Sequence, residues 1–133
     1  NYGAHHLDDM RAYATILPSV NQVELHPWNQ RPALRAATQA SGACVMAYSP
    51  LARGQKVGCG SLATIAESVG CTPAQAAIKW VYDTGAITIP KSSNPSRIEE
   101  NLASLDIDLT GTEDSFNAME EAYVSGWNPT AEP

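Results

Sequence analysis

Segments with the apolar pattern of strands alternate along this chain with segments that have the periodicity of helices. Such alternation favours a parallel sheet covered by helices, because neighbouring parallel strands need long connections that helices usually supply. The pattern predicts strands at residues 20–25, 44–48 and 86–89. It predicts helices at residues 4–14, 31–41, 61–69, 72–84, 95–103 and 112–124. The expected fold class is therefore α/β.

The segment 89–101 carries the strongest functional signal in the chain. It begins as the end of a buried strand, continues as a polar loop and enters a helix for which Asn94 is a suitable N-cap. Lys91 and Arg97 flank this helix start, and Ser92 adds a hydroxyl donor. Free N–H groups and the partial positive charge of a helix N-terminus favour an anion, so the segment predicts a phosphate site. The alternative is a solvated loop whose arginine pairs with a glutamate on the same helix face.

Charge and length exclude several classes of protein. The net charge is −6 and no cluster of Lys and Arg occurs, so we expect no nucleic-acid partner. No apolar run has the length of a membrane span, and we expect no membrane partner. With 133 residues, the chain is long enough for one small domain, which we expect to cover residues 1–133.

The cysteines indicate a reducing compartment. Cys44, Cys59 and Cys71 are an odd number and include no close pair of the metal-binding type. We interpret them as reduced thiols in a cytoplasmic protein, with Cys44 packed in the core.

Three motifs follow one another in a fixed order. They are VNQVELHP at residues 20–27, AYSPLARG at 47–54 and IPKSSNPSRIEEN at 89–101. Together they resemble the second half of the aldo-keto reductases, nicotinamide-dependent oxidoreductases with a (β/α)8 TIM barrel. The opening Asn1-Tyr2-Gly3 resembles the end of the family's Ser-Asn-Phe segment without its serine. The resemblance covers essentially the whole chain.

The resemblance implies only part of such a barrel. A complete eight-unit barrel needs roughly 200 to 250 residues. This chain of 133 residues therefore corresponds to the C-terminal half, with roughly three to four β/α units. We expect either a missing N-terminal half or self-association to complete it.

The resemblance further implies that NADP(H) is the cofactor. In the family, a residue at the position of Tyr48 stacks on the nicotinamide, and residues at Asn1 and Gln22 bind its carboxamide. A tyrosine that only fills the barrel rim is the alternative for Tyr48. For Gln22 the alternative is a hydrogen bond to the backbone of a neighbouring loop.

Two further groups of residues match cofactor-binding positions of the family. The loop that crosses the cofactor pyrophosphate corresponds to Ser49, Leu51 and Arg53, although Arg53 is equally compatible with a solvated loop. The residues that resemble the pocket for the adenosine 2′-phosphate are Lys91, Ser92, Asn94 and Arg97. Glu100 and Asn101 match positions that face the adenine, and an ion pair with Arg97 is compatible with this role for Glu100.

The implied activity is NADPH-dependent reduction of small aldehydes or ketones, in which this chain supplies cofactor binding. The family's catalytic Asp, Tyr, Lys and His lie in the first half of the barrel, and none maps onto this sequence. His5, His6 and His26 therefore inherit no catalytic role. We expect no metal site, because adjacent histidines on a helix point about 100° apart.

Two alternatives to this activity remain open. The chain could be a non-catalytic nucleotide-binding or self-associating half-barrel, or a product that does not fold. Glu24 and His26 are interpreted as structural polar residues of a strand and its exit. Trp127 is interpreted as a packing residue, and a position at the mouth of a pocket is the alternative.

Overall fold

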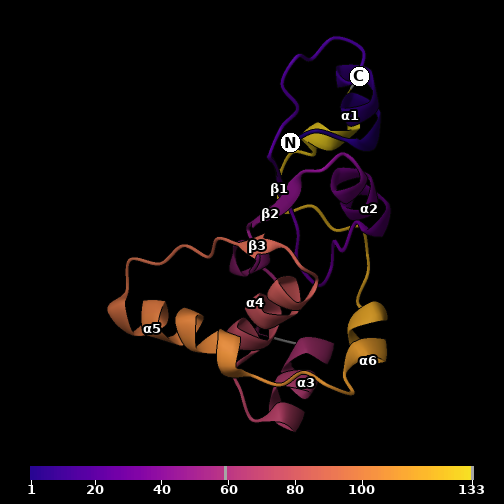
Figure 1. Cartoon of the computed structure of the whole chain (residues 1–133). Helices are drawn as coiled ribbons and strands as arrows, with labels where there is room; N and C mark the ends of the chain where they lie inside the picture. The colour runs from indigo at the N-terminus through magenta and orange to yellow at the C-terminus, as the bar shows by residue number, and fades with distance from the viewer. Residues whose placement is uncertain (59, 133) are drawn as a thin grey trace.

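The chain folds around a short sheet of three parallel strands (Figure 1). In the computed structural model, which describes residues 1–58 and 60–132, they are β1 (Val20–Glu24), β2 (Cys44–Tyr48) and β3 (Ile87–Thr88). β2 lies in the middle, where Met46 stands opposite Gln22 of β1 and Ile87 of β3. Helices fill both connections between neighbouring strands, as the alternating pattern predicts.

The helices of the described residues follow the strands as expected for β/α units. They are α1 (Ala4–Met10), α2 (Pro32–Ala40), α3 (Ser61–Val69), α4 (Pro73–Asp83), α5 (Pro95–Ala103) and α6 (Glu113–Asn117). Short 3-10 turns are η1 (Ala52–Gly54), η2 (Ser104–Asp106) and η3 (Pro129–Ala131). None of these helices is long and apolar enough to cross a membrane.

Local signals account for several helix boundaries. The Thr72 hydroxyl accepts a hydrogen bond from the Gln75 backbone N–H and begins α4, which has a proline in its first turn. The Asn94 side chain accepts one from the Ser96 N–H and begins α5. Gly70 ends α3 at φ 74°, a left-handed conformation that costs glycine little. The predicted bounds of β2, α3 and α5 are confirmed residue for residue.

Two predicted helices are shorter than expected. The helix predicted at residues 4–14 ends at Met10, where the N–H groups of Arg11 and Ala12 donate to carbonyls three residues back, and Tyr13 beyond it is exposed. The helix predicted at 112–124 ends at Asn117. The N–H groups of Glu121 and Tyr123 instead donate to the Trp28 carbonyl, and this tertiary pairing replaces the helical one.

The core lies on one side of the sheet. Val23, Val45 and Ala47 face this side and pack against apolar residues of α1, α2 and α4. A second cluster includes Leu62 and Phe116, and it joins α3, α4 and α6. The outer helices therefore cover one face of the sheet and each other.

The opposite face of the sheet is open to solvent. Val20 is 40 % and Ile87 45 % exposed, and Cys44 is exposed on the same face. Side chains alternate between the faces of a strand, so Cys44 points away from its buried neighbour Val45. The prediction that Cys44 packs in the core is therefore wrong. Cys44 and Cys71 are free thiols, and Cys59 lies outside the described residues.

The prediction that Trp127 packs is also wrong. Its side chain is 69 % exposed, and the indole N–H donates to a carboxylate oxygen of Glu132 at 3.0 Å. The hydrogen bond is local, because both residues belong to the C-terminal segment.

Candidate functional site

The loops after β2 and β3 meet at the carboxyl edge of the sheet. Parallel strands end at the same edge, so loops that are distant in sequence come together there. A cleft of about 420 Å³ lies between these two loops. Among the residues that line it are Ser49, Leu51, Arg53, Lys91 and Arg97.

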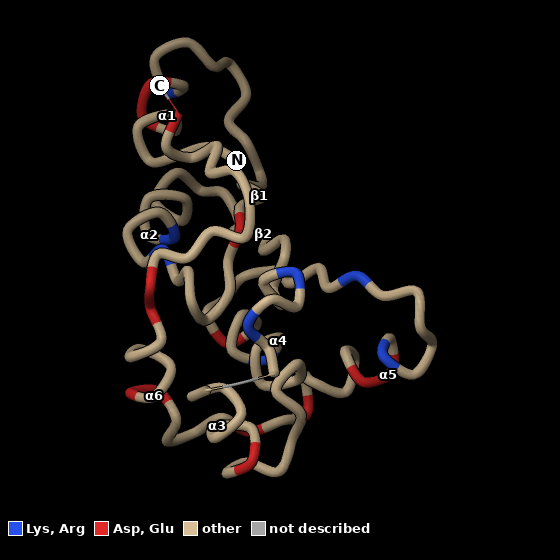
Figure 2. The backbone as a smooth tube through the Cα atoms, turned by 180° about the vertical axis from the view of Figure 1, so that it is seen from behind, with Lys and Arg blue, Asp and Glu red and all other residues tan. Residues whose placement is uncertain are grey.

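A second cleft of about 410 Å³ shares Leu51, Lys91 and Arg97 with the first. Ser92, Glu100 and Asn101 complete the predicted residues that line it. The two clefts are adjoining, so the structure brings together most of the residues predicted for the pyrophosphate, 2′-phosphate and adenine. Figure 2 shows basic residues on the loop that leads into α5 and on α5 itself.

The loop after β2 has an unusual backbone. Ser49, Ala52 and Arg53 have φ angles of 49°, 46° and 53°, in the left-handed region that residues other than glycine rarely occupy. Hydrogen bonds from the Ala52 N–H to the Ser49 carbonyl and from the Gly54 N–H to the Leu51 carbonyl form two successive turns in this loop. Strain of this kind clusters at ligand sites, where the rest of the fold holds it in place. Composition alone gave no sign of this feature.

At the start of α5, polar groups organise the helix end. The Asn94 side chain caps the helix, and the Ser92 hydroxyl accepts a hydrogen bond from the Asn94 N–H at 3.1 Å. Asn94 does not line either cleft, so the structure gives its side chain a capping role. The Glu100 carboxylate accepts a hydrogen bond from the Thr72 hydroxyl at 2.6 Å. An Arg97–Glu100 pair is absent from the ion pairs of the described residues.

Asn1 and Gln22 lie apart from the two clefts. Both line another cavity, beside β1, and the Asn1 amino group donates to the Gln22 carbonyl at 2.8 Å. The Gln22 side-chain amide lies 3.3 Å from the Met46 sulfur and not on a loop backbone. The Gln22 side chain is exposed on the open face of the sheet. Its amide is therefore accessible from the open face.

Tyr48 ends β2 and is half-buried. Burial raises the pKa of its phenol above the ordinary value, and the nearby Glu24 carboxylate adds to this rise. The phenol is therefore neutral at physiological pH. A neutral aromatic ring at the carboxyl end of a strand is suited to stack on a planar ligand ring.

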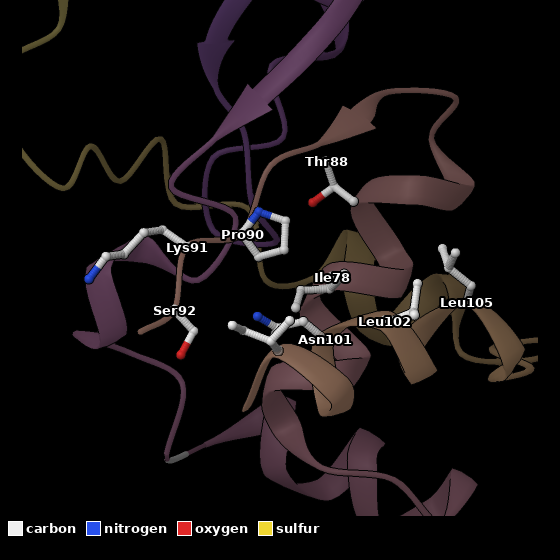
Figure 3. A pocket seen from close by; sticks show the side chains of 9 residues that line it. Ile78, Thr88, Pro90, Lys91, Ser92, Asn101, Leu102 and Leu105 are labelled. Carbon is white, nitrogen blue, oxygen red and sulfur yellow. The ribbon is translucent and has the colours of Figure 1, made fainter. Parts of the chain in front are cut away.

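A further cavity beside these loops is mainly apolar, and it shares Lys91, Ser92 and Asn101 with the second cleft. It has a volume of about 550 Å³ and lies between α4, β3 and α5, where Ile78, Leu102 and Leu105 line it. Figure 3 shows the Lys91 side chain extended away from these apolar residues. Most of the lining surface is apolar, so the part of the cavity beside Ile78, Leu102 and Leu105 is poorly suited to a phosphate.

A buried polar cluster at the end of β1 was only partly predicted. Glu24 is 2 % and His26 0 % exposed, and the His26 Nε2 lies 3.3 Å from a Glu24 carboxylate oxygen. Burial lowers the pKa of His26 below its ordinary value, although Glu24 acts in the opposite direction. The backbone N–H and the hydroxyl of Ser125 both donate to Glu24. Sequence reasoning missed Ser125, because nothing local links it to a strand 101 positions away.

A parallel sheet covered by helices on one face, with polar loops clustered at the strand carboxyl ends, is the arrangement of successive β/α units in a (β/α) barrel. The sequence model of the Aldo/keto reductase family matches residues 1–124. The chain belongs to this family.

Related sequences agree with this assignment. An uncharacterized oxidoreductase of Schizosaccharomyces pombe is 34 % identical, and the match covers 100 % of this chain and 49 % of that protein. Aldose reductase B of Dictyostelium discoideum is 38 % identical over 90 % of this chain and 39 % of its own length. The chain spans about half the length of the curated relatives it matches, or less.

Solved structures also match this chain over about half of their own length or less. A mutant of the protein Gox0644 in complex with NADPH has a TM-score of 0.89 and 32 % identity, covering 100 % of this chain and 50 % of that one. An aldo-keto reductase of Bombyx mori in complex with NADP has a TM-score of 0.82 and 30 % identity, and the match covers 93 % of this chain and 44 % of that one. The predicted fold, α/β of TIM-barrel type and about half of a barrel, is confirmed.

Proposed function

We propose that this chain forms the cofactor-binding half of an NADPH-dependent oxidoreductase that reduces small aldehydes or ketones to alcohols. One observation carries the proposal: the loops after β2 and β3 line adjoining clefts that contain Lys91 and Arg97. Neither cation takes part in an ion pair among the described residues. Both are exposed, so their charges are available to a ligand.

The chemistry of the lining groups fits a phosphorylated dinucleotide. A lysine and a guanidinium group make charge-assisted hydrogen bonds to a phosphate, and arginine can do so in a bidentate way. The Ser92 hydroxyl and the start of α5 lie on the same loop and add neutral donors. We assign these groups to the adenosine 2′-phosphate, with Glu100 and Asn101 toward the adenine.

The remaining predicted residues would hold the other parts of the cofactor. Ser49, Leu51 and Arg53 line the first cleft and are assigned to the pyrophosphate. Tyr48 is assigned to the nicotinamide face, and Asn1 and Gln22 to its carboxamide. Bound NADPH supplies the hydride for carbonyl reduction. The chain's own residues bind and orient it, and no residue of this chain matches the family's catalytic proton donor.

Titration with NADPH and NADH, followed by tryptophan and tyrosine fluorescence, tests this proposal. We expect NADPH to bind more tightly, because only NADPH carries the 2′-phosphate. Lys91→Ala should weaken NADPH by about 1–3 kcal/mol, the value of a charged hydrogen bond, and leave NADH nearly unchanged. Arg11→Ala is the matched control, since Arg11 is exposed and directly follows α1, and α1 lies far from α5 (Figure 1). Equal affinity for both cofactors would contradict the proposal.

A second candidate is a non-catalytic, self-associating half-barrel. The exposed apolar residues on the open face of the sheet, such as Val20 and Ile87, favour it. For this candidate we expect oligomers by light scattering and no carbonyl reduction with NADPH. Turnover by a purified monomer would exclude it. A cytoplasmic location is a prediction under either candidate.

A further inference from the structure

The C-terminal segment, residues 121–132, lies across the carboxyl end of β1. It leaves α6, passes α2 and reaches α1, as the yellow end of the chain in Figure 1 shows. The backbone N–H groups of Glu121 and Tyr123 donate to the Trp28 carbonyl at 3.2 and 2.9 Å. Arg31 donates to the Asn128 side-chain oxygen at 2.9 Å and to the Thr130 hydroxyl. The segment is therefore attached along its length and is not a free tail.

Its central attachment point is the carboxylate of Glu24. This side chain is 2 % exposed, and burial of a charge is costly unless hydrogen bonds compensate it. Ser125 supplies two of these bonds, from its N–H at 3.0 Å and from its hydroxyl, and His26 lies against the same oxygen. The position of Ser125 is consequently determined by a buried group at the end of β1.

The next residue, Gly126, touches the candidate cofactor site. A Cβ atom built on Gly126 would lie 3.2 Å from a guanidinium nitrogen of Arg53. The guanidinium therefore lies directly against the backbone of the segment. Arg53 has a left-handed backbone and lines the cleft with Ser49 and Lys91.

We propose that Glu24 is a positioning residue for cofactor binding. Through Ser125 it holds Gly126 behind Arg53, and this contact directs the Arg53 guanidinium toward the diphosphate of the nucleotide. The inference rests on the proposed function, and it adds a role for the C-terminal segment at the diphosphate. NADPH and NADH share the diphosphate, so the effect must be equal for both cofactors. Variants at the 2′-phosphate pocket must instead weaken the binding of NADPH more than that of NADH.

A double-mutant cycle with Arg53 tests this inference. Ser125→Ala should raise the Kd of NADPH and of NADH by the same factor, roughly fivefold to tenfold, within the range for residues of one network. In an Arg53→Ala background, Ser125→Ala should have no further effect. Ser125→Thr keeps the hydroxyl and should restore binding. Ser115→Ala, at an exposed serine of α6, is the matched control.

Gly126→Val tests the same contact without removing a buried group. It should weaken both cofactors like Ser125→Ala, again only when Arg53 is present, while the thermal melting temperature stays unchanged. Unchanged affinity in both Ser125→Ala and Gly126→Val would overturn the inference. So would an effect that persists in full without Arg53, because the segment would then act by another route. If the unmodified chain binds neither cofactor, the proposed function fails, and this inference with it.

Discussion

α4 and α5 share the same local sequence signals, but the apolar side chains of α4 are buried and those of α5 are exposed. Each begins at a side-chain cap followed by proline, and each carries an apolar stripe. In α4 the stripe is buried, with Ile78 at 1 % and Val81 at 0 % exposure. In α5 no residue is buried, and Ile98 and Leu102 are 52 % and 70 % exposed. Position in the fold, and not local sequence, decides which stripe contributes to the core.

The difference follows from the position of each helix relative to the sheet. α4 packs between both core clusters, whereas α5 lies beyond β3, at an edge of the molecule (Figure 1). In the described residues β3 is an edge strand that pairs only with β2, and no residue of α5 is buried. Exposed apolar stripes of this kind mark surfaces that pack against another chain or segment. We therefore expect α4 to determine stability, and α5 to determine ligand binding and association.

The largest predicted effect is the loss of a buried side chain from α4. Ile78→Ala removes three carbons from the core and should lower the free energy of unfolding by about 2–5 kcal/mol. Urea denaturation followed by circular dichroism measures this loss. Leu102→Ala is the control on α5 and should change the same quantity by less than about 0.5 kcal/mol. Similar losses in the two variants would show that the α5 stripe is also covered in solution.

The second effect concerns ligand binding by α5. Arg97→Ala should weaken NADPH binding by about 1–3 kcal/mol, because a charged hydrogen-bond donor to the phosphate is lost. Arg97→Lys keeps the charge but not the bidentate geometry, so its effect should lie between wild type and Arg97→Ala. Isothermal titration with each cofactor measures both. A loss of urea stability in Arg97→Ala would instead assign this residue to packing.

The helix caps should give a smaller and unequal effect. Thr72→Ala removes the cap of a packed helix and the 2.6 Å hydrogen bond to Glu100, and should cost about 0.5–2 kcal/mol. Asn94→Ala removes the cap of α5, a helix without buried residues, so α5 should fray while global unfolding changes less. Urea midpoints report global stability, and amide hydrogen exchange reports fraying. A larger urea effect from Asn94→Ala would reverse the comparison between the helices.

Local chemistry is what made most of the fold predictable. The glycine stop at Gly70 predicted the end of α3, the Asn94 cap predicted the start of α5, and strand pattern predicted β2, because these signals act within a few residues. The α6 region could not be predicted, since the Trp28 carbonyl takes N–H groups that a helix would otherwise use. These long-range hydrogen bonds therefore determine where α6 ends.

In the candidate site, too, the features set by local sequence could be predicted and the long-range contacts could not. Arg53 and Lys91 could be predicted to share a cleft, because their loops follow neighbouring parallel strands. The attachment of Ser125 to Glu24 could not, because it joins residues 101 positions apart that carry no shared motif. The local capping role of Asn94 was predicted from sequence, whereas its absence from the clefts emerged only from the fold.

The smallest effect on stability, and the sharpest test of the comparison, comes from a charge on the exposed stripe of α5. Leu102 is 70 % exposed, so Leu102→Glu should alter the free energy of unfolding by less than about 0.5 kcal/mol. The same charge should reduce self-association, measured as mass by light scattering, because an apolar contact surface would have to bury it. Ala103→Glu adds an equal charge to an exposed residue that follows Leu102 on the same helix. Equal reductions in both variants would assign the effect to net charge, and only a loss specific to Leu102→Glu identifies the stripe as the contact surface.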